Sequence, residues 1–161
     1  MYYFIRHSLA THNAKNFFAG NQVNTRLTSE GKQKSQQLFD TKVYRYPIDI
    51  IVSSSMTRAF QTAQIFQKNF KKLNKVIPII KTDLLKEIDI GCLSGLTINQ
   101  AKTRYPCEFI KGQSEDPKDW NFKNGESLLD LKNRSNQIKQ FLIDLNPQNK
   151  KNILIVGHAK I

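Results

Sequence analysis

The sequence predicts an α/β protein, a three-layer α/β/α sandwich with a mostly parallel central sheet. Short apolar segments alternate along the chain with segments whose apolar residues recur at three- and four-residue steps, the patterns of buried strands and of helices. With 161 residues, of which 39% are hydrophobic, the chain is long enough for one domain with a substantial core. In such a sheet the strands end at one edge, where ligands bind.

The first strand is expected at residues 2–5, where four consecutive apolar residues, three of them aromatic, predict a strand buried on both faces. Arg6 and His7 follow at once. A guanidinium is a planar fork of donors suited to phosphate or carboxylate, and an imidazole is a nucleophile and a proton carrier. Two solvated residues at the end of a strand would look the same, so this pair alone does not decide the function.

A helix should follow, with Thr28 as its N-cap and Glu30 in the first turn, facing the positive end of the helix dipole. It should end near Phe39 or Val43. The second strand is expected at residues 48–53, a segment of mostly β-branched apolar residues.

The serines at 53–55 offer N-caps for the next helix. Its apolar residues recur at steps of four and three, at Ala59, Ala63, Phe66, Phe70 and Leu73. Arg58 falls in the first turn, where the helix dipole disfavours a cation, and this hints at an anionic partner. A surface arginine is the alternative.

A third strand is expected at residues 76–80, and Pro78 favours an edge position for it. Thr97 can cap a short helix that Pro106 stops, and residues 112–125 are polar and predicted to form a loop.

Ser127 caps the last predicted helix, with Asp130 three residues on, close to a capping box. Its stripe consists of Leu128, Leu131, Ser135, Ile138, Leu142 and Leu145. Asn146-Pro147 ends the helix, and a final buried strand at 153–156 leads to His158.

The formal charge is +12, from 25 Lys and Arg against 13 Asp and Glu, which favours anionic partners in general. The lysines are scattered, without an arginine-rich arm, a zinc finger or an aromatic-basic motif, so no nucleic-acid partner is expected. We expect no membrane segment and no signal peptide, because the apolar runs are short and Arg6 and His7 interrupt the first. Cys92 and Cys107 do not have the CxxC or other spacing of a metal site, so we expect them to be reduced thiols in a cytoplasmic protein.

Three strand ends thus deliver Arg6-His7, Arg58 and His158 to one edge of the sheet. At this point the sequence resembles the histidine phosphatase superfamily, the phosphoglycerate mutase-like proteins. The matching motifs are Arg6-His7-Ser8, Asn13, Leu27-Thr28-Ser29-Glu30-Gly31, Ser54 to Ala63 with Arg58, Leu85 to Gly91 with Gly95, Gly125-Glu126-Ser127 and His158. They occur in the family's order along nearly the whole chain, and they imply one histidine phosphatase-like domain over residues 1–161.

The resemblance implies roles for these residues. His7 would attack phosphorus and carry a phosphohistidine intermediate, while Arg6, Arg58 and a protonated His158 would hold the phosphoryl oxygens. Asn13 would donate a further hydrogen bond to the phosphate. Glu87 would be the acid and base, preferred to Asp89 by its position in the family's motif. No cofactor and no metal is implied. A zinc site from His7, His12 and His158 is a less favoured alternative. Without zinc, His12 would be a loop or rim residue.

The substrate is expected to be a small phosphorylated metabolite. Only 38 residues separate Glu87 from Glu126, whereas the mutases carry a longer insertion, so the sequence looks most like the fructose-2,6-bisphosphatase and α-ribazole phosphatase branch. A second anionic group on the substrate could reach one of four lysines, namely Lys111, Lys118, Lys123 and Lys160. Ser8 replaces the family's glycine and is expected to line and narrow the pocket.

The chain stops three residues after His158, where family members usually continue with a further helix. We therefore expect an exposed apolar face. Three explanations fit this early stop: a truncated product, a weakly stable enzyme, or dependence on a partner chain, for instance in a homodimer. The rivals to a phosphatase are a cofactor-dependent phosphoglycerate mutase, an inactive phospholigand-binding protein and, less favoured, a basic nucleic-acid binder.

Overall fold

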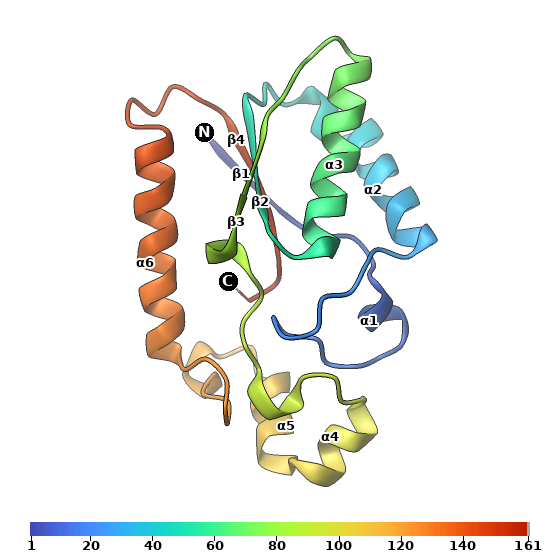
Figure 1. Ribbon diagram of the computed structural model, residues 1–161, viewed down its shortest axis with the longest axis vertical. Helices are drawn as coiled ribbons and strands as arrows, with labels where there is room; N and C mark the ends of the chain where they lie inside the picture. The colour runs from blue at the N-terminus through green and yellow to red at the C-terminus, as the bar shows by residue number, and fades with distance from the viewer. Residues whose placement is uncertain (161) are drawn as a thin grey trace.

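The computed structural model describes residues 1–160 and confirms the predicted α/β class. Its sheet has four parallel strands in the order β1-β4-β2-β3. The strands are β1 (Tyr2–Arg6), β2 (Ile50–Ser54), β3 (Ile79–Thr82) and β4 (Ile153–Gly157). Helices α2 (Ser29–Thr41) and α3 (Thr57–Lys72) cover one face, and α6 (Leu128–Leu145) covers the other (Figure 1). These are the three layers that the sequence predicts.

Two apolar cores lie on opposite faces of the sheet. Phe66 and Phe70 of α3 are fully buried against Ile51 and Leu154, which point to the same face. On the α6 side, residues such as Val52 pack with Leu142. The alternation of side chains along β2 and β4 thus supplies both cores.

Strand β1 corrects one expectation, because it lies at the edge of the sheet and not inside it. Phe4 is 67% exposed, since β1 has a single neighbouring strand and its outer part is left uncovered. The prediction that residues 2–5 are buried on both faces was therefore wrong. The edge position that Pro78 indicates for β3 is confirmed.

The predicted helix caps are largely confirmed. The Thr28 hydroxyl accepts a hydrogen bond from the Gly31 amide at 2.9 Å, and Ser127 forms a capping box with Asp130. Helix α3 differs, since its N-cap is Met56 and not one of the serines at 53–55, although Ser54 Oγ accepts from the Met56 amide at 3.2 Å.

Short helices gather beyond the carboxyl ends of the strands (Figure 1). They are α1 (Thr11–Ala14), α4 (Ile98–Arg104) and α5 (Pro106–Gln113). Residues 1–160 also contain 3-10 turns at Val43–Arg45, Asp83–Leu85, Gly91–Leu93 and Pro117–Asp119. Pro106 ends α4 as predicted but also begins α5, because proline suits the first position of a helix. The predicted loop at 112–125 is therefore partly helical. None of the helices in residues 1–160 combines the length and the apolar character needed to cross a membrane.

Candidate active site

The side chains expected at the strand ends do converge. His7 follows β1, and its amide donates to the Gly157 carbonyl at the end of β4 at 3.0 Å. The rings of His7 and His158 have centroids 5.1 Å apart. Arg58, in the first turn of α3, donates from Nε to His7 Nε2 at 3.2 Å. Two histidines and an arginine far apart in the sequence thus form one cluster, with Arg6 beside it.

The hydrogen bonds of His7 define its tautomer. Nδ1 lies 2.7 Å from the Ser8 carbonyl oxygen, which can only accept, so we assign the proton to Nδ1. Nε2 then has a free lone pair, which accepts from Arg58. Burial, together with the charges of Arg58 and Arg6, lowers the pKa of His7 to about 3, against the opposing effect of the hydrogen bond to Ser8. His7 is therefore a neutral imidazole at neutral pH, the form that a nucleophile needs.

Arg58 is held rigidly. Its side chain is 1% exposed, and its terminal nitrogens donate to the Gly20 carbonyl at 2.9 Å and the Val23 carbonyl at 3.2 Å. Burial lowers the pKa of Arg58 to about 10, which still leaves the guanidinium charged at neutral pH. The first-turn cation is thus a buried, preorganised charge and not a surface residue.

His158 is buried beside this charge. Its Nε2 lies 2.9 Å from Ser54 Oγ, while Nδ1 has no hydrogen-bond partner in residues 1–160. Burial, followed by the charge of Arg58, lowers the pKa of His158 to about 2. The imidazole is therefore neutral in the ligand-free cluster, in contrast to the protonated form expected from the sequence. An anion placed here would favour the protonated form.

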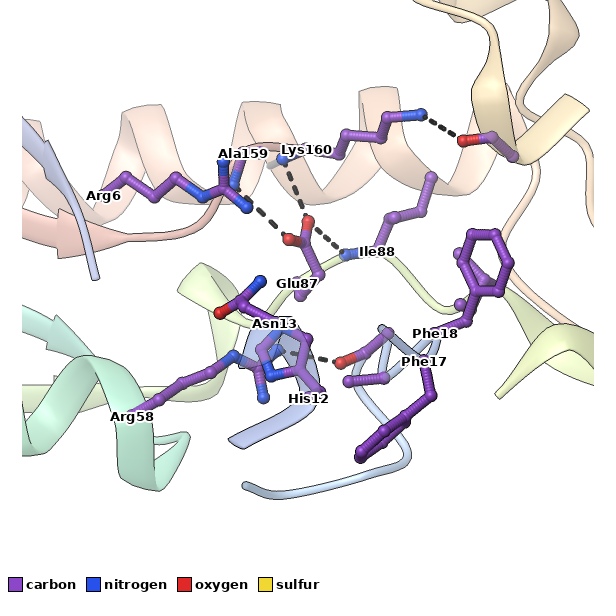
Figure 2. A pocket seen from close by; sticks show the side chains of 14 residues that line it. Arg6, His12, Asn13, Phe17, Phe18, Arg58, Glu87, Ile88, Ala159 and Lys160 are labelled. Carbon is purple, nitrogen blue, oxygen red and sulfur yellow. Dashed lines mark hydrogen bonds between the residues drawn. The ribbon is translucent and has the colours of Figure 1, made fainter. Parts of the chain in front are cut away.

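Glu87 lines a cavity of about 250 Å³ together with Arg6, Asn13 and Arg58 (Figure 2). Its carboxylate accepts hydrogen bonds from the amides of Lys160 at 2.9 Å, Ile88 at 3.2 Å and Ala159 at 3.4 Å. Burial nevertheless raises the pKa of Glu87, against the lowering effect of these bonds and of Arg58. A carboxyl group with a raised pKa beside a cationic cluster suits general acid catalysis.

Asp89, the rejected alternative to Glu87, points elsewhere. It accepts from Gln22 Nε2 at 2.7 Å and from the Gly91 amide at 2.8 Å, and it does not line the cavity. The geometry therefore favours Glu87.

Asn13 and His12 both lie on the cavity wall. Asn13 Oδ1 accepts from the Ala10 amide at 3.0 Å, which leaves the amide nitrogen to donate. His12 Nδ1 lies 2.8 Å from Thr25 Oγ1, and its ring centroid is 5.8 Å from that of His7. His12, expected at the rim, is thus part of the cavity. In residues 1–160, no three His, Cys, Asp or Glu side chains are grouped so as to hold a metal ion, so the geometry does not support the zinc alternative.

Ser8 does not line the cavity that contains Glu87. Its hydroxyl accepts from Ser35 Oγ of α2 at 2.7 Å, and its amide donates to Thr62 Oγ1 at 3.3 Å. Ser8 instead lines a neighbouring hollow of about 270 Å³ with Arg6, His7 and Asn13, so it borders the nucleophile but does not narrow the cavity that contains Glu87. Gly31 of α2 allows the backbone of Leu9 to lie close to this helix, because a Cβ at position 31 would be 1.9 Å from the Leu9 carbonyl oxygen.

Sequence reasoning missed two aromatic residues of the site, Phe17 and Phe18, which line the same cavity. The available signal was the pair of adjacent aromatics in an otherwise polar loop. Of the four lysines expected near the substrate, Lys160 alone lines this cavity, and Lys111 forms a salt bridge with Glu108 at 2.8 Å.

An ion pair braces the segment that carries Glu87. Arg134 of α6 binds the Glu126 carboxylate with two nitrogens at 2.7 and 2.8 Å, and its third donates to the carbonyls of Leu84 and Lys86 at 2.9 and 2.8 Å. Glu126 in turn accepts from the Asp89 amide at 2.8 Å. The backbone on both sides of Glu87 is thus tied to α6, which gives a structural role to the Gly-Glu-Ser motif.

Replacing Arg134 by methionine is expected to lower the free energy of unfolding by about 2–4 kcal/mol, because Glu126 and two carbonyls lose their partner in a largely buried place. Urea denaturation followed by circular dichroism measures the change. Lys139→Met, on an exposed position of the same helix, is the matched control. Equal stabilities of the two variants would contradict the bracing role.

Comparison with known proteins agrees with this geometry. The family model described as "Histidine phosphatase superfamily (branch 1)" matches residues 2–161. Phosphoserine phosphatase 1 of Hydrogenobacter thermophilus is 30% identical over 132 residues, which are 81% of this chain and 58% of that protein. A 2,3-bisphosphoglycerate-dependent phosphoglycerate mutase of Actinobacillus pleuropneumoniae is 36% identical over 110 residues, 66% of this chain and 46% of the mutase. The chain thus spans only about half the length of these relatives.

Solved structures show the same fold. YhfR of Bacillus stearothermophilus superposes with a TM-score of 0.83 at 25% identity, covering 98% of this chain and 73% of that one. The alpha-ribazole phosphatase of Shigella flexneri has a TM-score of 0.74 at 23% identity, with the same coverage of both chains. The family match over residues 2–161 and the clustered histidines and arginines lead to one conclusion: the chain belongs to the histidine phosphatase superfamily, branch 1.

Proposed function

We propose that the chain is a phosphomonoesterase that hydrolyses a small phosphorylated metabolite through a phosphohistidine on His7. One observation carries the proposal: a neutral imidazole, with its proton held on Nδ1 by Ser8, presents Nε2 to a buried arginine beside the cavity that contains Glu87. Nucleophile, charge and proton donor thus lie within one site, as phosphoryl transfer requires.

In the first step, Nε2 of His7 attacks phosphorus in line, and the bond to the ester oxygen breaks. Glu87 gives its proton to that oxygen, so that the alcohol leaves neutral. Arg6, Arg58 and Asn13 donate to the non-bridging oxygens, and His158 adds a donor on Nδ1 once the dianion has raised its pKa.

In the second step, the Glu87 carboxylate takes a proton from water, and the water oxygen attacks phosphorus. The bond between Nε2 and phosphorus breaks, inorganic phosphate leaves, and Glu87 is protonated again. Before the first step Arg58 must release Nε2, to which it donates in the ligand-free site. A phosphate oxygen is the stronger acceptor and would draw the guanidinium away.

The proposal predicts that the chain releases 4-nitrophenol from 4-nitrophenyl phosphate and forms an acid-labile phosphoenzyme. Rapid denaturation during turnover of ³²P-labelled ester, followed by acid and alkali treatment, measures the phosphoenzyme. Binding of inorganic phosphate without any turnover would contradict this proposal and support the inactive phospholigand-binding protein.

A phosphoglycerate mutase is the second candidate, favoured by the 36% identity to the mutase of Actinobacillus pleuropneumoniae. A mutase would return the phosphoryl group from His7 to a hydroxyl of the sugar acid instead of to water. Isomerisation of 3-phosphoglycerate with 2,3-bisphosphoglycerate present separates the two, and we expect release of phosphate to exceed isomerisation.

We also propose a cytoplasmic location. The free thiols of Cys92 and Cys107 support it, because unpaired cysteines are usual in a reducing compartment.

A further inference from the structure

The cavity that contains Glu87 has two chemically different ends. Figure 2 shows the side chains of Arg6 and Arg58 on one side of the view and those of Phe17 and Phe18 on the other, with Glu87 between them. Carbon surface from Ile88 and Ile90 joins the two rings on the cavity wall. The phosphoryl group belongs at the cationic end, so the leaving group lies at the apolar end.

The apolar end continues outward. A second hollow of about 230 Å³ shares His12, Asn13, Phe17 and Phe18 with the first and adds Ile98, Asn16 and Gln113. Ile98 is 39% exposed, although it begins helix α4, whose Ala101 is buried in a further apolar cluster with Leu93. The two hollows together offer a leaving group more apolar contact than a three-carbon sugar acid can use.

Within residues 1–160, no lysine or arginine lines the second hollow, although Lys15 lines a neighbouring one that shares Asn16 and Ile98 with it. Lys160 lines the first cavity, but its ammonium group donates to the carbonyls of Gly112 at 3.3 Å and Ser114 at 3.0 Å and lies 4.5 Å from the centre of the Trp120 ring. Burial, with the charges of Arg58 and Arg6, lowers the pKa of His12 to about 4, so that its ring is neutral. A second anion of the substrate in the second hollow would therefore lose hydration without a lysine or arginine on the wall to replace it.

We infer that the substrate is a phosphate monoester of an uncharged alcohol that carries an apolar or aromatic group. This rests on the proposed function and narrows its substrate class. Bisphosphates and phosphorylated sugar acids are poor substrates, and the lysines considered from the sequence do not bind a second anionic group.

The test compares two primary alkyl esters, 2-phenylethyl phosphate and 3-phosphoglycerate, whose leaving oxygens have similar basicity. For the full chain, the phenylethyl ester is expected to show the higher kcat/KM, by about 10- to 100-fold, the range set by burial of one aromatic ring. Equal values, or a preference for 3-phosphoglycerate, would overturn the inference.

The matched variants are Phe17→Ala and Phe4→Ala. Phe17 stands on the wall with its ring edge-on to His12, at 6.1 Å between centroids, whereas Phe4 is a 67% exposed ring on β1 outside both hollows. Phe17→Ala is expected to reduce the preference for the phenylethyl ester at least fivefold, and Phe4→Ala to leave it unchanged. If Phe17→Ala slows both esters equally, the ring does not select the leaving group and the inference fails.

Binding separates this inference from the proposed function. Should the chain hydrolyse neither ester, the phosphatase proposal fails, but calorimetry with two phosphonates still decides the preference. 2-Phenylethylphosphonate is expected to bind at least tenfold more tightly than 3-phosphonopropanoate. Equal or inverted affinities would overturn the inference, whatever the activity.

Discussion

Replacing His7 by alanine is expected to lower the hydrolysis of 4-nitrophenyl phosphate by about 10⁴-fold or more, because the reaction loses its nucleophile. No second group in the cluster is equivalent: His158 Nε2 is engaged by Ser54, and His12 Nδ1 is engaged by Thr25. Arg58 and Arg6 remain in the variant, so binding of inorganic phosphate should change far less than the rate does.

Initial rates and isothermal calorimetry with phosphate measure these two effects. The phosphoenzyme trapped from ³²P-labelled ester should disappear in His7→Ala. Cys107→Ser is the control, because Cys107 is an exposed free thiol away from the cluster, and it should keep the wild-type rate. A His7→Ala variant that still forms the phosphoenzyme would place the nucleophile elsewhere.

The cationic cluster was predictable because topology and local pattern agree on it. Parallel strands end at one edge, so the ends of β1, β2 and β4 had to bring His7, Arg58 and His158 together once the strands were located. The helix caps at Thr28 and Ser127 were equally clear, since an oxygen at the N-cap satisfies a particular amide of the first turn.

Other features depend on which strands are neighbours, and no local pattern encodes that. Residues 2–5 are as apolar as a central strand, yet β1 has only β4 beside it, and Phe4 faces outward. The ionisation of the cluster was not predictable either. The neutral state of His158 follows from burial beside Arg58, and both conditions arise only in the folded chain.

Replacing Glu87 by glutamine is expected to slow the hydrolysis of 2-phenylethyl phosphate by about 10²–10⁴-fold, because the departing alkoxide loses its proton donor. 4-Nitrophenol leaves as a stable phenolate and does not need that proton. With its ester the variant should show a burst of one equivalent of 4-nitrophenol, followed by slow turnover, because the amide cannot deprotonate the attacking water. Rapid-quench kinetics with both esters measures the contrast.

The pH dependence should identify the same carboxyl group. Burial raises the pKa of Glu87, so the protonated acid persists to higher pH than in an exposed glutamate, and kcat/KM for the alkyl ester falls as pH rises through that pKa. His7, with a pKa of about 3, remains the neutral nucleophile throughout this range. In Glu87→Gln the alkaline fall attributed to this group should vanish.

Asp89→Asn is the matched control, since it removes a carboxylate two residues away that binds Gln22 and the Gly91 amide. Its leaving-group dependence and its alkaline limb should both match those of the wild type. If Asp89→Asn shows the burst with 4-nitrophenyl phosphate and Glu87→Gln does not, the acid is Asp89, and the segment braced by Arg134 must rearrange when substrate binds. If neither variant shows it, another group deprotonates the attacking water, and the raised pKa of Glu87 reflects burial alone.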